Sequence, residues 1–137
     1  MTTKTVAILL FPDVLMLDVA GPIEVFSVAN RYLPESDHYR IVTLGAESLS
    51  VRASNGIVMQ ADQLAVDAPV AYDTLLVPGG PGAYNERHPH LYGWLREAAQ
   101  ASRRHGAVCT GAFILGEAGL LDGHRVTTCL LYTSPSP

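Results

Sequence analysis

The stretch GAVCTGAFILGEAGLLDG, residues 106–123, joins two kinds of sequence at a single cysteine. A short apolar segment typical of a buried strand precedes Cys109, and a segment rich in helix formers follows it. Gly111, two residues after the cysteine, lets backbone approach closely where a side chain would block it. The stretch therefore predicts a strand that turns directly into a helix, with a sulfur at the turn.

Three other apolar runs have strand length: KTVAILLF (4–11), YRIVTLG (39–45) and DTLLVPGGPG (73–82), the last of which enters a glycine-rich loop. Strands that are apolar on both sides are typical of a parallel sheet whose two faces are covered. Helical patterns alternate with these runs, so the expected fold class is α/β, a sandwich around a mainly parallel sheet. In such sheets ligands bind at the carboxyl ends of the strands, which here are VPGG and VCTG.

The connecting segments carry their own signals. A helix is expected to open at Pro22, and PHLYGWLREAAQASRRHG (89–106) is expected to be helical throughout, with its basic last turn and a glycine closing it. Two further elements are expected, a hairpin at Asn55-Gly56 and a strand over RVTT (125–128).

The bulk composition restricts the possible functions. The 137 residues are the size of one domain, and a hydrophobic content of 48% is that of a globular protein. The net charge is −4 and the densest basic cluster is residues 103–105, so the chain itself is not expected to bind nucleic acid. No apolar run approaches the ~20 residues that span a bilayer, and Pro12 and Asp13 stand where a signal peptide has small residues. We therefore expect a cytoplasmic protein without membrane contact. Cys109 and Cys129 could form one disulfide, but in a cytoplasmic chain two free thiols are the expectation.

A cysteine at a strand-to-helix turn has chemical advantages. The turn exposes the sulfur, and the positive end of the following helix favours the thiolate. The amides of Gly79 and Gly80 are expected to add further donors, which would complete a pocket for an anion or an oxyanion. The alternative remains that Cys109 is an inert buried side chain and that the glycines only form a turn.

Proton chemistry at Cys109 requires a nearby acid, and two carboxylates, Asp18 and Glu24, follow the first strand. Asp18 also suits a plain capping role at a helix N-terminus, and Glu24 also suits a solvated helix face. His88 and His90 flank a proline and are interpreted as solvated loop residues, not as metal ligands. Neither a metal nor a cofactor is expected.

Four stretches together resemble the PfpI superfamily of amidotransferase-like domains: VAILLFPDVLMLDVAGPIEVFSVANR, SNGIVMQAD, YDTLLVPGGPG and VCTGAFILGEAGLLDGHRVTT. Within that superfamily they most resemble the N-terminal domain of AraC-type transcriptional regulators, and isocyanide (isonitrile) hydratases are close relatives. The resemblance extends over residues 4–128. It implies a flavodoxin-like three-layer sandwich and a homodimer.

The resemblance also implies roles for single residues. The reactive cysteine of the superfamily, at its nucleophile elbow, matches Cys109, and Thr110 supplies a backbone donor. The acid that hydrogen-bonds this cysteine in the enzymes matches Asp18. The glycine pair whose amides face the cysteine matches Gly79 and Gly80.

Two departures from the family pattern affect the domain organisation. Family members continue Thr-Thr-His-Trp where this chain has TTCL (127–130), so a histidine expected near the site is missing. Residues 1–128 are therefore interpreted as a PfpI-like domain that is incomplete at its C-terminus, and 129–137 as a non-native or truncated tail. The helix-turn-helix domain of the regulators does not follow, so contact with DNA is expected only through a domain absent from this chain.

Two functions follow from the resemblance. The first is a sensing domain that binds a small metabolite near Cys109 and Asp18 and regulates transcription without turnover. The alternative is an isocyanide hydratase-like lyase in which Cys109 is the nucleophile and Asp18 the acid and base. Both functions require a small-molecule ligand or substrate.

Overall fold

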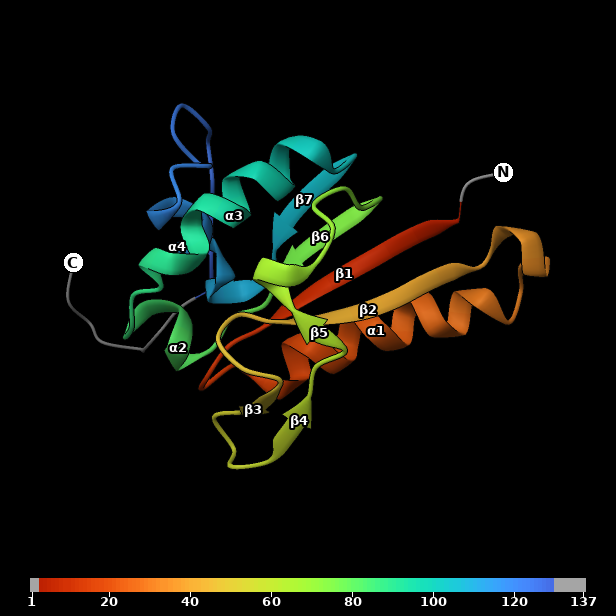
Figure 1. Ribbon diagram of the computed structural model, residues 1–137, viewed down its shortest axis with the longest axis horizontal. Coiled ribbons are helices and arrows are strands. Elements are labelled where there is room, and N and C mark those ends of the chain that lie inside the picture. Colours follow the sequence, from red (N-terminus) through yellow and green to blue (C-terminus); the bar gives the residue numbers. More distant parts are fainter. Residues whose placement is uncertain (1–2, 130–137) are drawn as a thin grey trace.

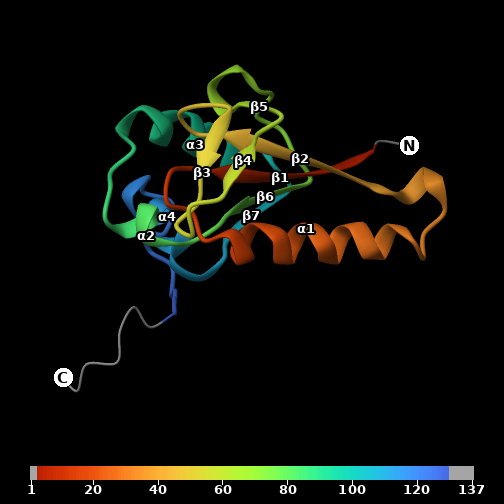
Figure 2. The same ribbon diagram turned by 90° about the horizontal axis from the view of Figure 1, so that it is seen from below.

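A five-stranded, wholly parallel sheet organises the chain in the computed structural model, which describes residues 3–129. In the order β5-β2-β1-β6-β7 the strands are β5 (Gln63–Leu64), β2 (Tyr39–Gly45), β1 (Lys4–Leu10), β6 (Thr74–Val77) and β7 (Arg104–Ala107). The helices are α1 (Met16–Asn30), α2 (Pro81–Tyr84), α3 (Pro89–Ala101) and α4 (Ala112–Glu117). α1 lies on one face of the sheet and α3 on the other (Figures 1 and 2). This three-layer architecture confirms the predicted α/β fold class.

The central strand β1 is buried on both faces of the sheet. Its residues 6–10 are at most 1% exposed, and it pairs in parallel with β2 and β6. Its side chains are apolar at successive positions, so both faces of the strand contribute to the core. The largest fully buried side chains include Ile8, Leu9, Phe11, Leu44, Leu75, Leu91, Leu95 and Ile114.

α1 begins at Met16, six residues before the proline that was expected to open it. The expected start at Pro22 is therefore wrong, and this proline lies inside the helix. A tertiary contact sets the true start, because the N–H of the N-cap residue Leu15 donates to the carbonyl oxygen of Gly79 (2.8 Å). Asp18 consequently lies in the first helical turn.

In the described part of the chain, no helix is both long and apolar enough to cross a membrane.

α3 ends at Ala101, earlier than its basic C-terminal pattern indicated. Ser102 leaves the helix and its hydroxyl accepts the N–H of Tyr72 (3.1 Å) while donating to the carbonyl of Val70 (3.2 Å). Arg104 then pairs with Thr74 as the first residue of β7. The prediction of a helix through residue 106 is therefore wrong. The basic segment that was expected to end the helix instead forms β7 and pairs with β6.

The expected hairpin is confirmed as β3 (Ser50–Arg52) and β4 (Val58–Gln60), with Gly56 at a φ of +89° in the turn. The expected strand over 125–128 is wrong, since these residues have no regular structure. A β-prone segment needs a pairing partner to become a strand, and residues 125–128 have none in the described chain. Of the expected tail, residues 130–137 lie outside the described residues.

Candidate functional site

Cys109 occupies the turn between β7 and α4, as the sequence predicts. It opens a 3₁₀ turn, Cys109–Gly111, and its φ is +54°. Among the non-glycine residues described, only Asp13 shares a positive φ (+62°). Non-glycine residues adopt this left-handed conformation rarely, at an energetic cost that the surrounding structure must offset. The cysteine is half-buried, so its turn reaches the surface of the molecule.

Gly79 brings Asp18 next to this turn. The N–H of Gly79 donates to Asp18 Oδ2 (3.1 Å). A Cβ added to Gly79 would stand 2.9 Å from the same carboxylate oxygen and 2.7 Å from the backbone nitrogen of Thr110. The carboxylate and the first amide after Cys109 therefore both lie close to the same glycine.

Gly80 makes a second link to the turn. Its N–H donates to Thr110 Oγ1 (2.8 Å), and the Thr110 side chain is buried. The amides of Gly79 and Gly80, expected to face the sulfur, thus donate to a carboxylate and a hydroxyl of the protein itself. In this arrangement they serve to position Asp18 and Thr110.

Glycine is needed in this loop because backbone packs directly on backbone. A Cβ at Gly80 would meet Asp13 O at 2.7 Å in a conformation with φ of +120°. A Cβ at Gly82 would collide with the carbonyl oxygen of Pro12, and one at Gly111 with that of Val77. The turns that follow β1, β6 and β7 therefore interlock with no room for side chains between them.

The two candidate acids differ in their surroundings. Asp18 is half-buried and makes no capping hydrogen bond within its own helix, so the simple capping role does not describe it. Its hydrogen bond to the glycine loop places it at the carboxyl edge of the sheet. Glu24 is exposed further along α1. Only Asp18 is brought to the Cys109 turn by a described contact.

Cys109 and Cys129 form a disulfide, which corrects the expectation of two free thiols. The hydroxyl of Thr128 also donates to the carbonyl oxygen of Cys109 (2.7 Å). These two contacts hold residues 128–129 against the turn. In this oxidised form the sulfur of Cys109 cannot act as a thiolate, so thiol chemistry requires reduction first.

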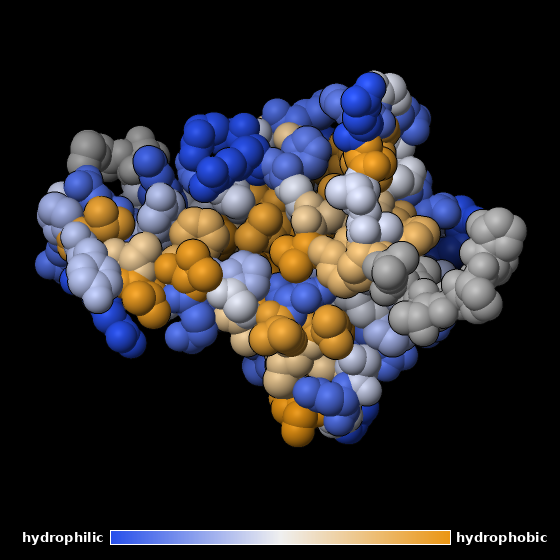
Figure 3. Space-filling model, turned by 180° about the vertical axis from the view of Figure 1, so that it is seen from behind, coloured by the Kyte–Doolittle hydropathy of each residue, from blue (hydrophilic) through white to orange (hydrophobic). Residues whose placement is uncertain are grey.

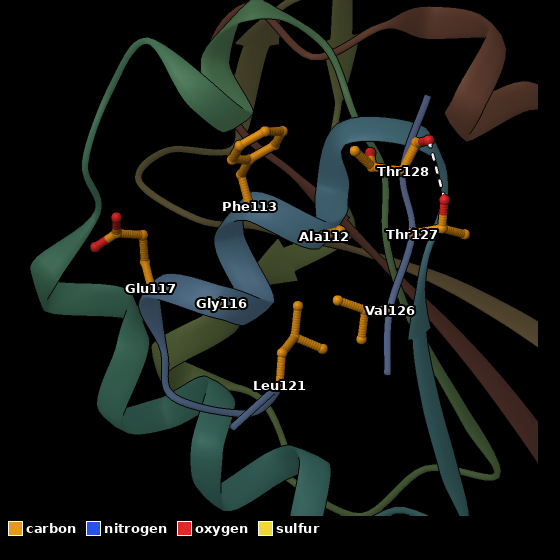
Figure 4. A pocket seen from close by; sticks show the side chains of 8 residues that line it. All are labelled: Ala112, Phe113, Gly116, Glu117, Leu121, Val126, Thr127 and Thr128. Carbon is orange, nitrogen blue, oxygen red and sulfur yellow. Dashed lines mark hydrogen bonds between the residues drawn. The ribbon is translucent and has the colours of Figure 1, made fainter. Parts of the chain in front are cut away.

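An apolar cavity of about 330 Å³ adjoins the turn, between α4 and residues 126–128 (Figure 4). Leu121 and Val126 project toward each other across it, and Phe113 and Glu117 lie along α4 (Figure 4). Phe113 also packs at a tilt against Tyr84 of α2, with ring centroids 6.1 Å apart. Both rings are partly exposed and form an aromatic rim beside the turn.

His88 is fully buried, contrary to the interpretation of a solvated loop residue. Its Nε2 lies 2.9 Å from the carbonyl oxygen of Gly82, and its backbone N–H donates to the hydroxyl of Tyr92 (3.0 Å). The sequence contains no periodic signal for this burial, because a single loop residue turns inward at the start of α3. Between residues 3 and 129 no group of three or more His, Cys, Asp or Glu side chains could hold a metal ion.

An ion pair lies at the other edge of the sheet, before β6 and β7. Arg103 Nε is 2.6 Å from Asp73 Oδ1, and this hydrogen bond lowers the pKa of Asp73 below its usual value. It also raises the pKa of Arg103. The pair supports the fold and is remote from Cys109.

Residues 4–135 match the DJ-1/PfpI family. An uncharacterized protein in the cpoL 5' region of Streptomyces lividans is 42% identical over 132 residues, or 94% of this chain and 89% of that protein. The isonitrile hydratase of Pseudomonas putida is 33% identical over 93% of this chain and 53% of its own length. The HTH-type transcriptional regulator GbdR of Pseudomonas aeruginosa is 34% identical over 88% of this chain and 32% of its own length.

A solved structure of a regulator has the same fold as this chain. An AraC family transcriptional regulator from Pseudomonas putida superposes with a TM-score of 0.74 at 26% identity, over 88% of this chain and 64% of that one. The chain thus spans about a third of the regulator GbdR and about half of the isonitrile hydratase.

Proposed function

The chain belongs to the DJ-1/PfpI family, and on that premise we propose that it is the sensing domain of an AraC-type transcriptional regulator. A small metabolite would bind at the carboxyl edge of the sheet, beside Asp18 and Cys109. The observation that carries this proposal is that Gly79 holds the Asp18 carboxylate next to the Cys109 turn. The similarity to the regulators GbdR and CdhR over 87–88% of this chain supports the choice of class.

The chemistry of the site suits a ligand with a hydrogen-bond donor or a positive charge. Asp18 offers the ligand a carboxylate, and the rings of Tyr84 and Phe113 offer apolar contact and π-faces. An amine- or amino-acid-like metabolite meets both conditions. Binding would change how an attached DNA-binding domain dimerises. Contact with DNA would belong to that separate domain, and the whole protein would be cytoplasmic.

A second function is favoured by the relation to the isonitrile hydratase and by the strained turn at Cys109. After reduction, the Cys109 thiolate would add to the terminal carbon of an isocyanide, and Asp18 would deliver the proton. Water would then displace the sulfur and release an N-substituted formamide, with the thiolate restored. The sensing proposal predicts no such turnover.

Incubation of the reduced protein with an aryl isocyanide separates the two functions. The sensing domain is expected to form no formamide above background. Formamide that is lost in Asp18→Asn and in Cys109→Ser, but kept in the matched control Glu24→Gln, would establish the enzyme instead. A panel of amines and amino acids then tests sensing by thermal shift, where a shift lost in Asp18→Asn and kept in Glu24→Gln is the expected result.

The proposal includes a homodimer formed through α1, which is unusually apolar for a surface helix. Only Val19 of this helix is buried, while Leu17 is 74% exposed and Val25 is 67% exposed. Apolar side chains gather over α1 and the β3–β4 hairpin when the molecule is seen from behind (Figure 3). Monomeric proteins rarely leave such a continuous apolar surface in water.

The spacing on α1 favours a second copy of the same helix as the occupant. Leu17, Gly21, Val25 and Val28 follow one another at intervals of four or three residues, which places them on one face of α1. Tyr32 continues this spacing just beyond the end of the helix. A Cβ at Gly21 would meet nothing within 4 Å, so this glycine leaves a notch in the stripe. A stripe of this kind is self-complementary in an antiparallel pair, as a twofold interface requires.

A further inference from the structure

The buried imidazole of His88 has one nitrogen that is satisfied and one that is not. Nε2 lies 2.9 Å from the carbonyl oxygen of Gly82, which can only accept, so Nε2 carries a proton. Nδ1 has no hydrogen-bond partner and is buried. Oε1 of Glu47, on the loop that follows β2, lies 3.4 Å from Nδ1.

The protonation state of the imidazole decides whether this contact attracts or repels. In the neutral ring Nδ1 is an acceptor and faces a carboxylate oxygen, which is an acceptor too. With a second proton, Nδ1–H becomes a charge-assisted donor to Glu47. A buried acceptor without a donor is costly, and a second proton on the ring replaces that acceptor with a donor that faces Glu47.

We propose that His88 and Glu47 form a proton-operated clamp on the glycine-rich loop 79–82. When His88 takes up its second proton, it links the loop after β2 to the carbonyl of Gly82, and α2 is held in place. When the proton leaves, the contact with Glu47 is lost and the loop loosens.

The clamp reaches the candidate site through short backbone contacts. The N–H of Gly82 donates to Asp13 O (3.1 Å), and that of Ala83 donates to Gly80 O (2.9 Å). Gly80 in turn donates to Thr110, directly after Cys109. A change in the hold on Gly82 therefore reaches the Cys109 turn through backbone contacts and the buried hydroxyl of Thr110.

The groups that face His88 are few. Glu47 approaches from the loop after β2, and the hydroxyl of Tyr92 approaches the backbone N–H from α3. Phe11 packs against the ring with centroids 5.7 Å apart and carries no charge. The neighbouring Arg87 is paired with Glu117 at 2.9 Å. Glu47 is therefore the charged partner through which a proton on His88 acts.

Amide hydrogen exchange of the full chain, without ligand, tests the clamp. We expect the protection factors of the Gly82 and Ala83 amides to be about fivefold higher at about pH 5.5 than at about pH 8. Glu47→Gln should abolish this difference, because the glutamine amide donates to neutral Nδ1 and holds the loop at both pH values. Glu86→Gln, an exposed acid on the loop before His88, is the matched control and should retain the difference.

Two results would overturn the clamp: a wild-type ratio near one, or the same ratio in Glu47→Gln as in the wild type. The ¹⁵N shifts of the His88 ring provide an independent reading, since only the proposed form has protons on both nitrogens at the lower pH. The importance of the clamp for function rests on the site proposed above. Because exchange is measured without any ligand or substrate, the clamp and the proposed function can fail separately.

Discussion

The amide nitrogen of Gly79 and the Oδ2 of Asp18 are 61 residues apart in the chain and 3.1 Å apart in the structure. This hydrogen bond joins the turn after β6 to the first turn of α1. It is the reason that Asp18 lies beside the Cys109 turn instead of capping its own helix. The position of the candidate acid is thus decided by a glycine from a distant segment.

Gly79→Ala is expected to destabilise the protein by about 1–3 kcal/mol, because its Cβ would stand 2.6 Å from Thr110 Oγ1 and 2.7 Å from Thr110 N. Urea unfolding measures the change. Gly93→Ala is the control, since this glycine lies in α3 with only the end of Arg96 within reach (4.0 Å). That substitution should stabilise the helix by about 0.5–1 kcal/mol, and equal losses in both variants would contradict the close packing at Gly79.

Cys109 is expected to resist alkylation until the disulfide to Cys129 is removed. In Cys129→Ser, or after reduction, iodoacetamide should react with Cys109 near pH 7 faster than with free cysteine, because the start of the following helix favours the thiolate. Mass spectrometry of the labelled peptide measures the rate. Labelling no faster than that of a free cysteine would refute an activated thiol and weaken both proposed functions.

Asp73→Asn is expected to lower stability near neutral pH and to have little effect in acid. The hydrogen bond from Arg103 holds the pKa of Asp73 below its unfolded value, so the stabilisation is present above that unfolded value and is lost as the pH falls through the folded one. The free energies of unfolding of wild type and variant should therefore converge as the solution becomes more acidic than about pH 4. Asp67→Asn, which removes an exposed carboxylate, is the control, and a gap that persists in acid would argue against the pair.

Val25→Glu is expected to convert a dimer to a monomer, because it places a charge in the apolar stripe of α1. Sedimentation velocity of the wild type and the variant measures this at matched concentrations. Val66→Glu is the matched control, since Val66 is 55% exposed and lies outside α1. A monomeric wild type, or two variants that behave alike, would remove α1 as the interface.

The strands were predictable because a strand buried on both faces consists of consecutive apolar residues. KTVAILLF and YRIVTLG became β1 and β2, and Asn55-Gly56 became a turn with Gly56 at positive φ. Cys109 was likewise predicted at its turn, since the change from strand to helix residues is local.

The errors arose where distant contacts overrule local preference. Pro22 suits a helix start, but the contact between Leu15 and Gly79 begins α1 six residues earlier. Ser102 ends α3 because its hydroxyl hydrogen-bonds to the segment before β6. No local sequence pattern predicts this contact. The inward turn of His88 and the pairing of the two cysteines depend on positions that only the folded chain brings together.

The interlocked turns around Gly79, Gly80 and Gly82 have a consequence for redesign of the specificity of this protein. At Gly80, Gly82 and Gly111 an added Cβ would meet backbone atoms, so these positions of the proposed site have no room for a side chain. The aromatic walls formed by Tyr84 and Phe113 are partly open to solvent and separate from these positions. Variation that seeks a new ligand should start from these walls, and libraries directed at the glycines should yield mostly unfolded chains.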